Sequence, residues 1–369
     1  MTKLLSQVTI KDIILKNRLV MSPMGTQQSL FNDRVSLDDL YYYHNRAGAP
    51  SLVITGAAQV QANGRSLPGM FGAYSDTQIN GLQKLANTIK AKGSKAILQI
   101  FHSGRMTSQK NTDGRPIVGP SPIKSEREEF DLPRELTESE IEELITDFVK
   151  ATQRAILAGF DGIELHGAHT YIVQQFFSPN SNHRSDKWGG NIEKRYYFID
   201  VLTNRITQTI EKSENPNFIF GYRISPEEYE TQGIRFEDTL YLIKKLVKKP
   251  IDYIHVSVNH YLKVSRSPEY SQYPMLKYIK EITNDKTLLM GVGGIRTNED
   301  ANTALDFCDL IAVGSPMIAD LNFAEKLLKG ELKDDNHYRD LPKLNDLNDL
   351  FDYVQTIRDK KEKNLIDKA

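Results

Sequence analysis

The chain has 369 residues, a formal net charge of −1, 39% hydrophobic residues and 26% charged residues. This composition excludes disordered and collagen-like classes, and the balanced charge gives no support for nucleic-acid binding. The single cysteine, Cys308, excludes an intrachain disulfide and an all-cysteine metal or iron–sulfur site. The N-terminus has no apolar signal core and no apolar run is long enough to span a membrane. We therefore expect a soluble, cytoplasmic protein without a membrane partner.

Eight short apolar runs along the chain predict β-strands. They are rich in Ile, Val and Leu and show little alternation, which is typical of parallel strands buried on both faces. The predicted strands are 18–21, 51–55, 96–101, 161–166, 218–224, 252–257, 288–291 and 309–313.

Helical patterns lie between these runs. The clearest begins at Thr137, where Glu140 completes a capping box, and stops at Gly159. Further helices are predicted near 37–48, 78–92, 192–212, 236–248, 275–283, 299–306 and 322–329, and the proline-rich segment 108–134 is read as a long strand-to-helix loop.

This alternation over the whole chain predicts an α/β fold, a (β/α)₈ TIM barrel. A doubly wound sheet is less well supported, because no glycine-rich fingerprint follows the first strand. The length alone allows two or three domains, but the pattern favours one barrel over 1–330. A helical extension over 331–369, with an amphipathic segment near 344–360, is expected to pack on the barrel or on a neighbouring subunit, which leaves a homo-oligomer open.

Active sites of such barrels lie at the C-terminal ends of the strands, and small and polar residues gather after the predicted strands here. The loops after the seventh and eighth strands often bind phosphate. Gly293, Gly294, Gly314 and Ser315 can offer backbone N–H groups there, although each loop alone fits a plain turn.

His166 and His169 follow the fourth strand and would point the same way on a helical turn. They could form a metal pair, but a catalytic zinc needs a third ligand and Glu164 is a poor candidate for it. Alternatively they are two donors for a carbonyl or anionic oxygen, with Tyr171 as a proton donor, or simply packed histidines.

Gln99 and Arg223 are predicted to be buried on the third and fifth strands. A buried arginine needs an anionic or carbonyl partner. That partner is either an Asp or Glu of the protein or an electron-rich cofactor ring.

At these residues the sequence resembles the Old Yellow Enzyme family of FMN-dependent ene-reductases, in particular its bacterial NADH-dependent flavin oxidoreductase branch. The resemblance spans roughly residues 3–330. It is carried by residues 16–24, Gln99 with Gly104 and Arg105, residues 166–171, residues 177–195, and the glycine loops at 293–294 and 314.

The resemblance implies an oxidoreductase in which NADH or NADPH reduces a tightly bound FMN, which then reduces an activated small-molecule alkene such as an enone, enal or nitro-alkene. It implies that His166 and His169 hold the substrate oxygen and that Tyr171 donates the proton. FMN contacts are implied for Pro23, Met24, Gly25, Gly56, Ala57, Gln99 and Arg223, and phosphate contacts for Gly293, Gly294, Gly314 and Ser315. No metal is implied.

Two departures from the family pattern bear on the cofactor. Gly25 stands where relatives often have Cys or Thr, and Ser315 stands where most have Arg. Two other hypotheses stay open on the residues alone: a flavin-free or metal-assisted barrel lyase or hydrolase that uses His166 and His169, and a barrel that binds a phosphorylated ligand without catalysis.

Overall fold

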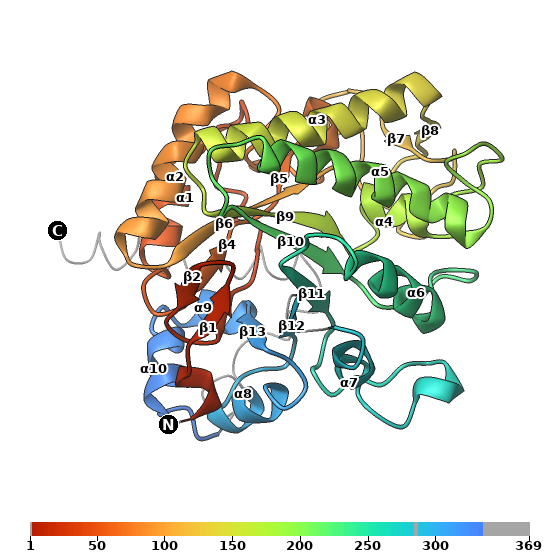
Figure 1. Ribbon diagram of the computed structural model, residues 1–369. Helices are drawn as coiled ribbons and strands as arrows, with labels where there is room; N and C mark the ends of the chain where they lie inside the picture. Colours follow the sequence, from red (N-terminus) through yellow and green to blue (C-terminus); the bar gives the residue numbers. More distant parts are fainter. Residues whose placement is uncertain (1, 284–286, 335–369) are drawn as a thin grey trace.

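A computed structural model describes residues 2–283 and 287–334, and it shows the predicted barrel (Figure 1). Eight parallel strands pair in the order β3-β4-β6-β9-β10-β11-β12-β13, and β13 pairs with β3 to close the ring. All eight predicted strands are confirmed. They are β3 (Leu19–Met21), β4 (Leu52–Ile54), β6 (Lys95–Phe101), β9 (Gly162–Gly167), β10 (Ile219–Ile224), β11 (Tyr253–Ser257), β12 (Leu288–Val292) and β13 (Leu310–Val313).

The predicted helices are also present and surround the barrel (Figure 1). They are α1 (Leu37–His44), α2 (Ile79–Ala91), α3 (Glu138–Leu157), α5 (Ile192–Glu211), α6 (Phe236–Leu246), α7 (Met275–Lys280), α8 (Asn298–Ala304) and α10 (Phe323–Lys329). The short helices α4 (Ile172–Phe177) and α9 (Ser315–Ala319) were not predicted. The predicted segment 344–360 lies outside the described residues, and the boundary at 330 stays a prediction.

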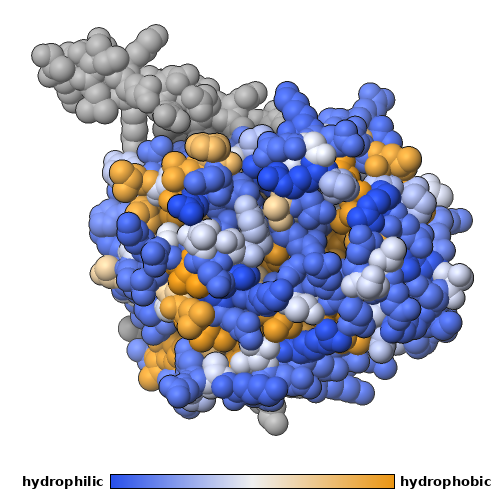
Figure 2. Space-filling view, turned by 90° about the horizontal axis from the view of Figure 1, so that it is seen from above, coloured by the Kyte–Doolittle hydropathy of each residue, from blue (hydrophilic) through white to orange (hydrophobic). Residues whose placement is uncertain are grey.

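Helix α3 shows how local sequence fixes an element. The Thr137 side chain accepts from the Glu140 N–H, and the Glu140 carboxylate accepts from the Thr137 N–H at 2.8 Å. Apolar residues at spacings of three and four are buried on one face, including Ile141, Leu144 and Phe148. Figure 2 looks onto the outer side of this helical layer, which is largely hydrophilic with separate hydrophobic patches.

An N-terminal hairpin that was not predicted closes one end of the barrel. Strands β1 (Val8–Ile10) and β2 (Ile13–Leu15) are antiparallel. Ile10 and Leu15 join the core cluster inside the barrel, with Ile97 and Ile219 among its members. The arrowheads of β9 and β10 point away from the hairpin in Figure 1, so the hairpin covers the N-terminal end of the strands.

The predicted loop 108–134 is confirmed as an ordered excursion between β6 and α3. It carries β7 (Val118–Gly119), which pairs in parallel with β8 (Arg134–Glu135) at its end. A shorter excursion after β4 carries β5 (Ala58–Gln59). No described helix is long and apolar enough to cross a membrane.

Candidate active site

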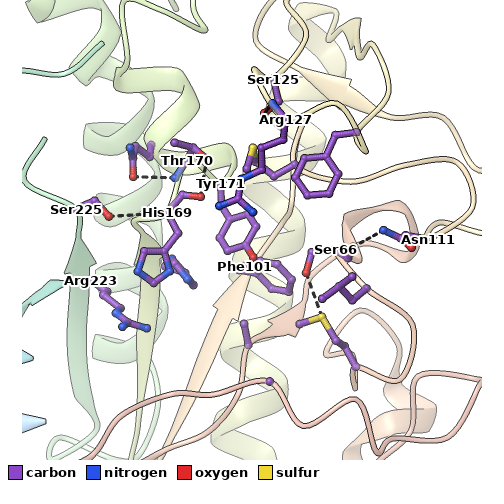
Figure 3. A pocket seen from close by; sticks show the side chains of 18 of the residues that line it. Ser66, Phe101, Asn111, Ser125, Arg127, His169, Thr170, Tyr171, Arg223 and Ser225 are labelled. Carbon is purple, nitrogen blue, oxygen red and sulfur yellow. Dashed lines mark hydrogen bonds between the residues drawn. The ribbon is translucent and has the colours of Figure 1, made fainter. Parts of the chain in front are cut away.

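A cavity of about 1030 Å³ opens at the C-terminal ends of the strands. This is the end of the barrel where the sequence predicts the site. Figure 3 shows Tyr171 between Phe101 and Arg127, with His169 and Arg223 on the side of Ser225. The predicted site residues that line the cavity are Pro23, Met24, Gly25, Ala57, Gln99, His166, His169, Tyr171, Arg223 and Ser315.

The two histidines come together, but not on a helical turn. His166 lies on β9, whereas His169 and Thr170 follow it in the left-handed region, with φ of 55° and 58°. The rings of His166 and His169 are 5.1 Å apart and edge to face. The expected helical geometry is therefore wrong, and a strained left-handed turn produces the convergence instead.

Side chains on both sides of this turn hold it in place. The His169 N–H donates to Ser225 Oγ at 3.0 Å, and the Thr170 N–H donates to Gln174 Oε1 at 3.0 Å. The Gln175 side-chain amide donates to the Thr170 carbonyl at 2.6 Å. These bonds compensate backbone groups that a left-handed turn would otherwise leave without partners.

Both histidines are held neutral. Burial lowers the pKa of His166 well below its usual value, and His169 and Arg223 lower it further. The pKa of His169 is also lowered well below its usual value, first by desolvation and then by the positive charge of Arg223. The residue remains accessible from the cavity. His166 Nδ1 accepts from the Ala168 N–H at 3.2 Å, so the single ring proton of His166 lies on Nε2.

Tyr171 lies beside this pair. Its ring packs edge to face on His166 at 4.9 Å and on Phe101 at 5.1 Å. Burial raises the pKa of Tyr171, and Ser66, Arg127 and Arg223 only partly oppose the shift. The phenol is therefore protonated at neutral pH and can donate a proton.

The floor of the cavity is polar. Arg223 is 6% exposed, and one of its terminal nitrogens donates to Ser257 Oγ at 3.2 Å. The same Ser257 Oγ lies 2.7 Å from His169 Nε2. The Nε donor of Arg223 is buried without a partner among the described residues. A buried cation with an unused donor beside this cavity fits an electron-rich ring that brings an acceptor, as the flavin of FMN does.

Sequence reasoning considered Glu164 only as a metal ligand and did not predict its place beside Arg223, where it lies fully buried beneath the cavity. The negative charge of Glu164 raises the pKa of Arg223 and thus stabilises its cationic form. The protein acid that was considered as a partner for Arg223 is therefore present, and the cofactor ring remains a possible second partner. Residues 164 and 166 are two apart on one strand and therefore share a face. That alternation was the signal that would have placed Glu164 inside the barrel.

Gly56 does not line the cavity but packs behind its wall. A Cβ at Gly56 would lie 2.5 Å from the Met24 carbonyl oxygen, whereas a Cβ at Gly25 would meet no atom within 4 Å. Gly56 thus lets the loops after β3 and β4 approach closely.

We expect Gly56→Ala to lower the free energy of unfolding of the apoprotein by about 1–3 kcal/mol, because two backbones must separate. Gly25→Ala is the matched control and is expected to have little effect. Urea unfolding followed by circular dichroism checks both. Equal stability of the two variants would contradict the close packing inferred at Gly56.

The glycine loops lie beside the cavity, and only Ser315 reaches its lining. A Cβ at Gly293 would lie 2.1 Å from the Val258 carbonyl oxygen, and one at Gly294 would lie 2.7 Å from the His260 ring. A Cβ at Gly314 would lie 3.3 Å from Met24 Sδ and 3.7 Å from Ser22 Cβ. These loops therefore need small residues for packing, and their role toward a phosphate stays a prediction.

The metal-assisted hypothesis finds no support here. Within residues 2–283 and 287–334, no group of three or more His, Cys, Asp or Glu side chains is placed to hold a metal ion. The third ligand that His166 and His169 would need is thus not supplied by these parts of the chain.

The barrel, the cavity at the strand ends and the paired donors together define a TIM-barrel active site with a place for an electron-rich cofactor ring. The model of the NADH:flavin oxidoreductase / NADH oxidase family matches residues 3–334, and the chain belongs to this family, the Old Yellow Enzyme family. Membership of this family favours a flavin-dependent enzyme over the flavin-free and non-catalytic hypotheses.

Relatives of the chain carry related activities. It is 42% identical over 336 residues to an NADH:acrylate oxidoreductase of Vibrio harveyi, covering 90% of this chain but only 34% of that relative. The chain therefore spans about a third of that protein's length. It is 34% identical to a Bacillus subtilis (strain 168) protein named probable NADH-dependent flavin oxidoreductase YqiG, covering 87% and 86% of the two chains. A structure of morphinone reductase in complex with tetrahydroNAD matches with a TM-score of 0.77 at 25% identity, covering 90% of this chain and 92% of that one.

Proposed function

We propose that this NAD(P)H-dependent flavin oxidoreductase reduces the double bond of an activated alkene, such as an enone, enal or nitro-alkene. The observation that carries the proposal is the convergence of His166, His169 and Tyr171 on one cavity wall. Two neutral N–H donors beside a protonated phenol are suited to an oxygen that becomes negative and a carbon that needs a proton. The name of the Vibrio harveyi relative also specifies an activated alkene, acrylate.

FMN, when bound, supplies the hydride chemistry between NAD(P)H and the alkene. Gln99 and Arg223 would hold the polar edge of its ring, and Pro23, Met24, Gly25 and Ala57 would form the adjacent wall. Gly56 would support that wall from behind. Gly293, Gly294, Gly314 and Ser315 would hold the phosphate.

The chain's own residues then orient the substrate. His166 would donate from Nε2, because its Nδ1 accepts from the Ala168 N–H. Ser257 Oγ accepts from Arg223 and would donate to His169 Nε2, which leaves the ring proton of His169 on Nδ1 for the substrate. Hydrogen bonds from these two donors to the substrate oxygen would draw electron density from the double bond and so polarise it. Tyr171 would protonate the carbon next to the activating group, and its raised pKa keeps the phenol protonated at neutral pH.

The test follows the two halves of the reaction separately under anaerobic conditions. NADH is expected to bleach the yellow protein, and 2-cyclohexenone, acrylate or a nitro-alkene is expected to restore the colour with one equivalent of saturated product. A protein that NADH bleaches but that no alkene re-oxidises would overturn the proposal. It would indicate an enzyme that passes electrons to another acceptor.

The phosphate assignment predicts an effect of Ser315→Arg. Ser315 is exposed, so a longer side chain has room. A new charge-assisted contact contributes about 1.5–3 kcal/mol, so FMN is expected to bind at least tenfold more tightly. Riboflavin, which lacks the phosphate, is expected to bind unchanged.

Fluorescence titration of the apoprotein measures both dissociation constants, and Ser315→Gln is the neutral control. An equal gain for FMN and riboflavin, or no gain for FMN, would place the phosphate elsewhere.

A further inference from the structure

Four polar side chains form a buried layer across four neighbouring strands of the barrel. Gln99 on β6 is paired in register with Glu164 on β9, and Arg223 on β10 is paired with His255 on β11. Gln99 is 2% exposed, and Glu164 and His255 are fully buried. Gln99 and Glu164 lie one inward-facing position above Ile97 of the apolar interior and one position below His166, which is in register with Arg223.

Glu164 binds two neighbours in this layer. Its Oε1 accepts from Gln99 Nε2 at 2.6 Å, and its Oε2 lies 2.9 Å from His255 Nδ1. Burial acts to raise the pKa of Glu164, but His255, Arg223 and Gln99 outweigh it and lower the pKa. Burial also lowers the pKa of His255. Glu164 is therefore ionised, and His255 donates to it from Nδ1.

An ionised carboxylate can only accept hydrogen bonds. Gln99 must therefore turn its NH₂ group toward Glu164, which leaves its carbonyl oxygen for the cavity that Gln99 lines. Among the described residues the Gln99 side chain forms its hydrogen bond through Nε2, and Gln99 lines the cavity. The orientation of the Gln99 amide is thus set by the charge on Glu164.

We propose that Glu164 is a positioning residue that, held by His255, fixes Gln99 as a hydrogen-bond acceptor for the N–H of the flavin's pyrimidine ring. Glu164 also partly neutralises Arg223, so the same carboxylate moderates the positive charge presented to the ring. This inference rests on the proposed placement of FMN over Gln99 and Arg223.

The test compares FMN with 3-methyl-FMN, in which that N–H is replaced by N–CH₃. The wild-type apoprotein is expected to bind FMN more tightly than 3-methyl-FMN. In Glu164→Gln the uncharged amide can donate as well as accept, so Gln99 can turn over. The preference for FMN is expected to fall by about tenfold, the value of one hydrogen bond.

The reduction potential of bound FMN gives a second readout. Removal of the negative charge leaves Arg223 unbalanced, so the potential is expected to rise in Glu164→Gln. Glu164→Asp keeps the charge but draws it back from Gln99. It is expected to lose the preference for FMN with little change in potential, and it serves as the test if Glu164→Gln does not fold.

Glu228→Gln is the matched control. Glu228 is another buried carboxylate at the cavity, but it accepts from Gln174 at 2.7 Å and does not touch Gln99. It is expected to leave the FMN preference unchanged. An unchanged preference in folded Glu164→Gln or Glu164→Asp, or a wild type that does not distinguish the two flavins, would overturn the inference. Alkene reduction by the wild type would still stand in either case, so the two proposals fail separately.

Discussion

Tyr171→Phe is expected to slow alkene reduction by about 10²–10⁴-fold, the usual contribution of a positioned general acid. The substitution removes one hydroxyl and keeps the ring that packs on His166 and Phe101. Bleaching of the flavin by NADH needs no proton from Tyr171 and is expected to stay near the wild-type rate. Stopped-flow absorbance of the two half-reactions measures both rates.

Phe101→Leu is a useful control, because it disturbs the packing of Tyr171 without removing the hydroxyl. It is expected to affect both half-reactions modestly. If Tyr171→Phe slowed both half-reactions equally, the residue would shape the cavity and would not donate the proton.

Arg223→Leu is expected to cost about 3 kcal/mol in the free energy of unfolding of the apoprotein. Removal of one member of a buried charge pair leaves the other without compensation, and such losses are about 3–5 kcal/mol. Glu164 keeps its bonds to Gln99 and His255, which places the expected cost at the low end.

The double variant Arg223→Leu/Glu164→Gln removes both charges and is expected to recover much of this loss. Urea unfolding of the apoproteins measures the three free energies, and Arg223→Lys tests whether charge alone suffices. Additive losses in the double variant would show that Arg223 and Glu164 do not compensate each other.

Most of the barrel could be predicted from the sequence because parallel strands buried on both faces are continuous apolar runs. Each predicted strand agrees with the structure to within about two residues at its ends. The hairpin of β1 and β2 escaped prediction, since its strands have three residues each and lack a strong turn signal. Their role depends on Ile10 and Leu15 reaching the barrel interior, a contact between segments far apart in the chain.

The candidate site could be predicted at the level of which residues meet, but not how they meet. Strand ends brought His166, Gln99 and Arg223 to one cavity, as barrel geometry requires. The left-handed turn at His169 and Thr170 could not be predicted, because positive φ is uncommon for any residue other than glycine. Tertiary partners such as Ser225 and Gln174 impose it.

That turn has a consequence for anyone who wishes to broaden the substrate range of this enzyme by directed evolution. Positive φ at two successive non-glycine residues costs about 1–3 kcal/mol each, and Gln174, Gln175 and Ser225 offset that cost. A library that randomises these three supports would lose most members to misfolding before selection could act on their chemistry. Diversity is better placed at cavity-lining residues that support neither the turn nor the cofactor, such as Glu129 and Phe130.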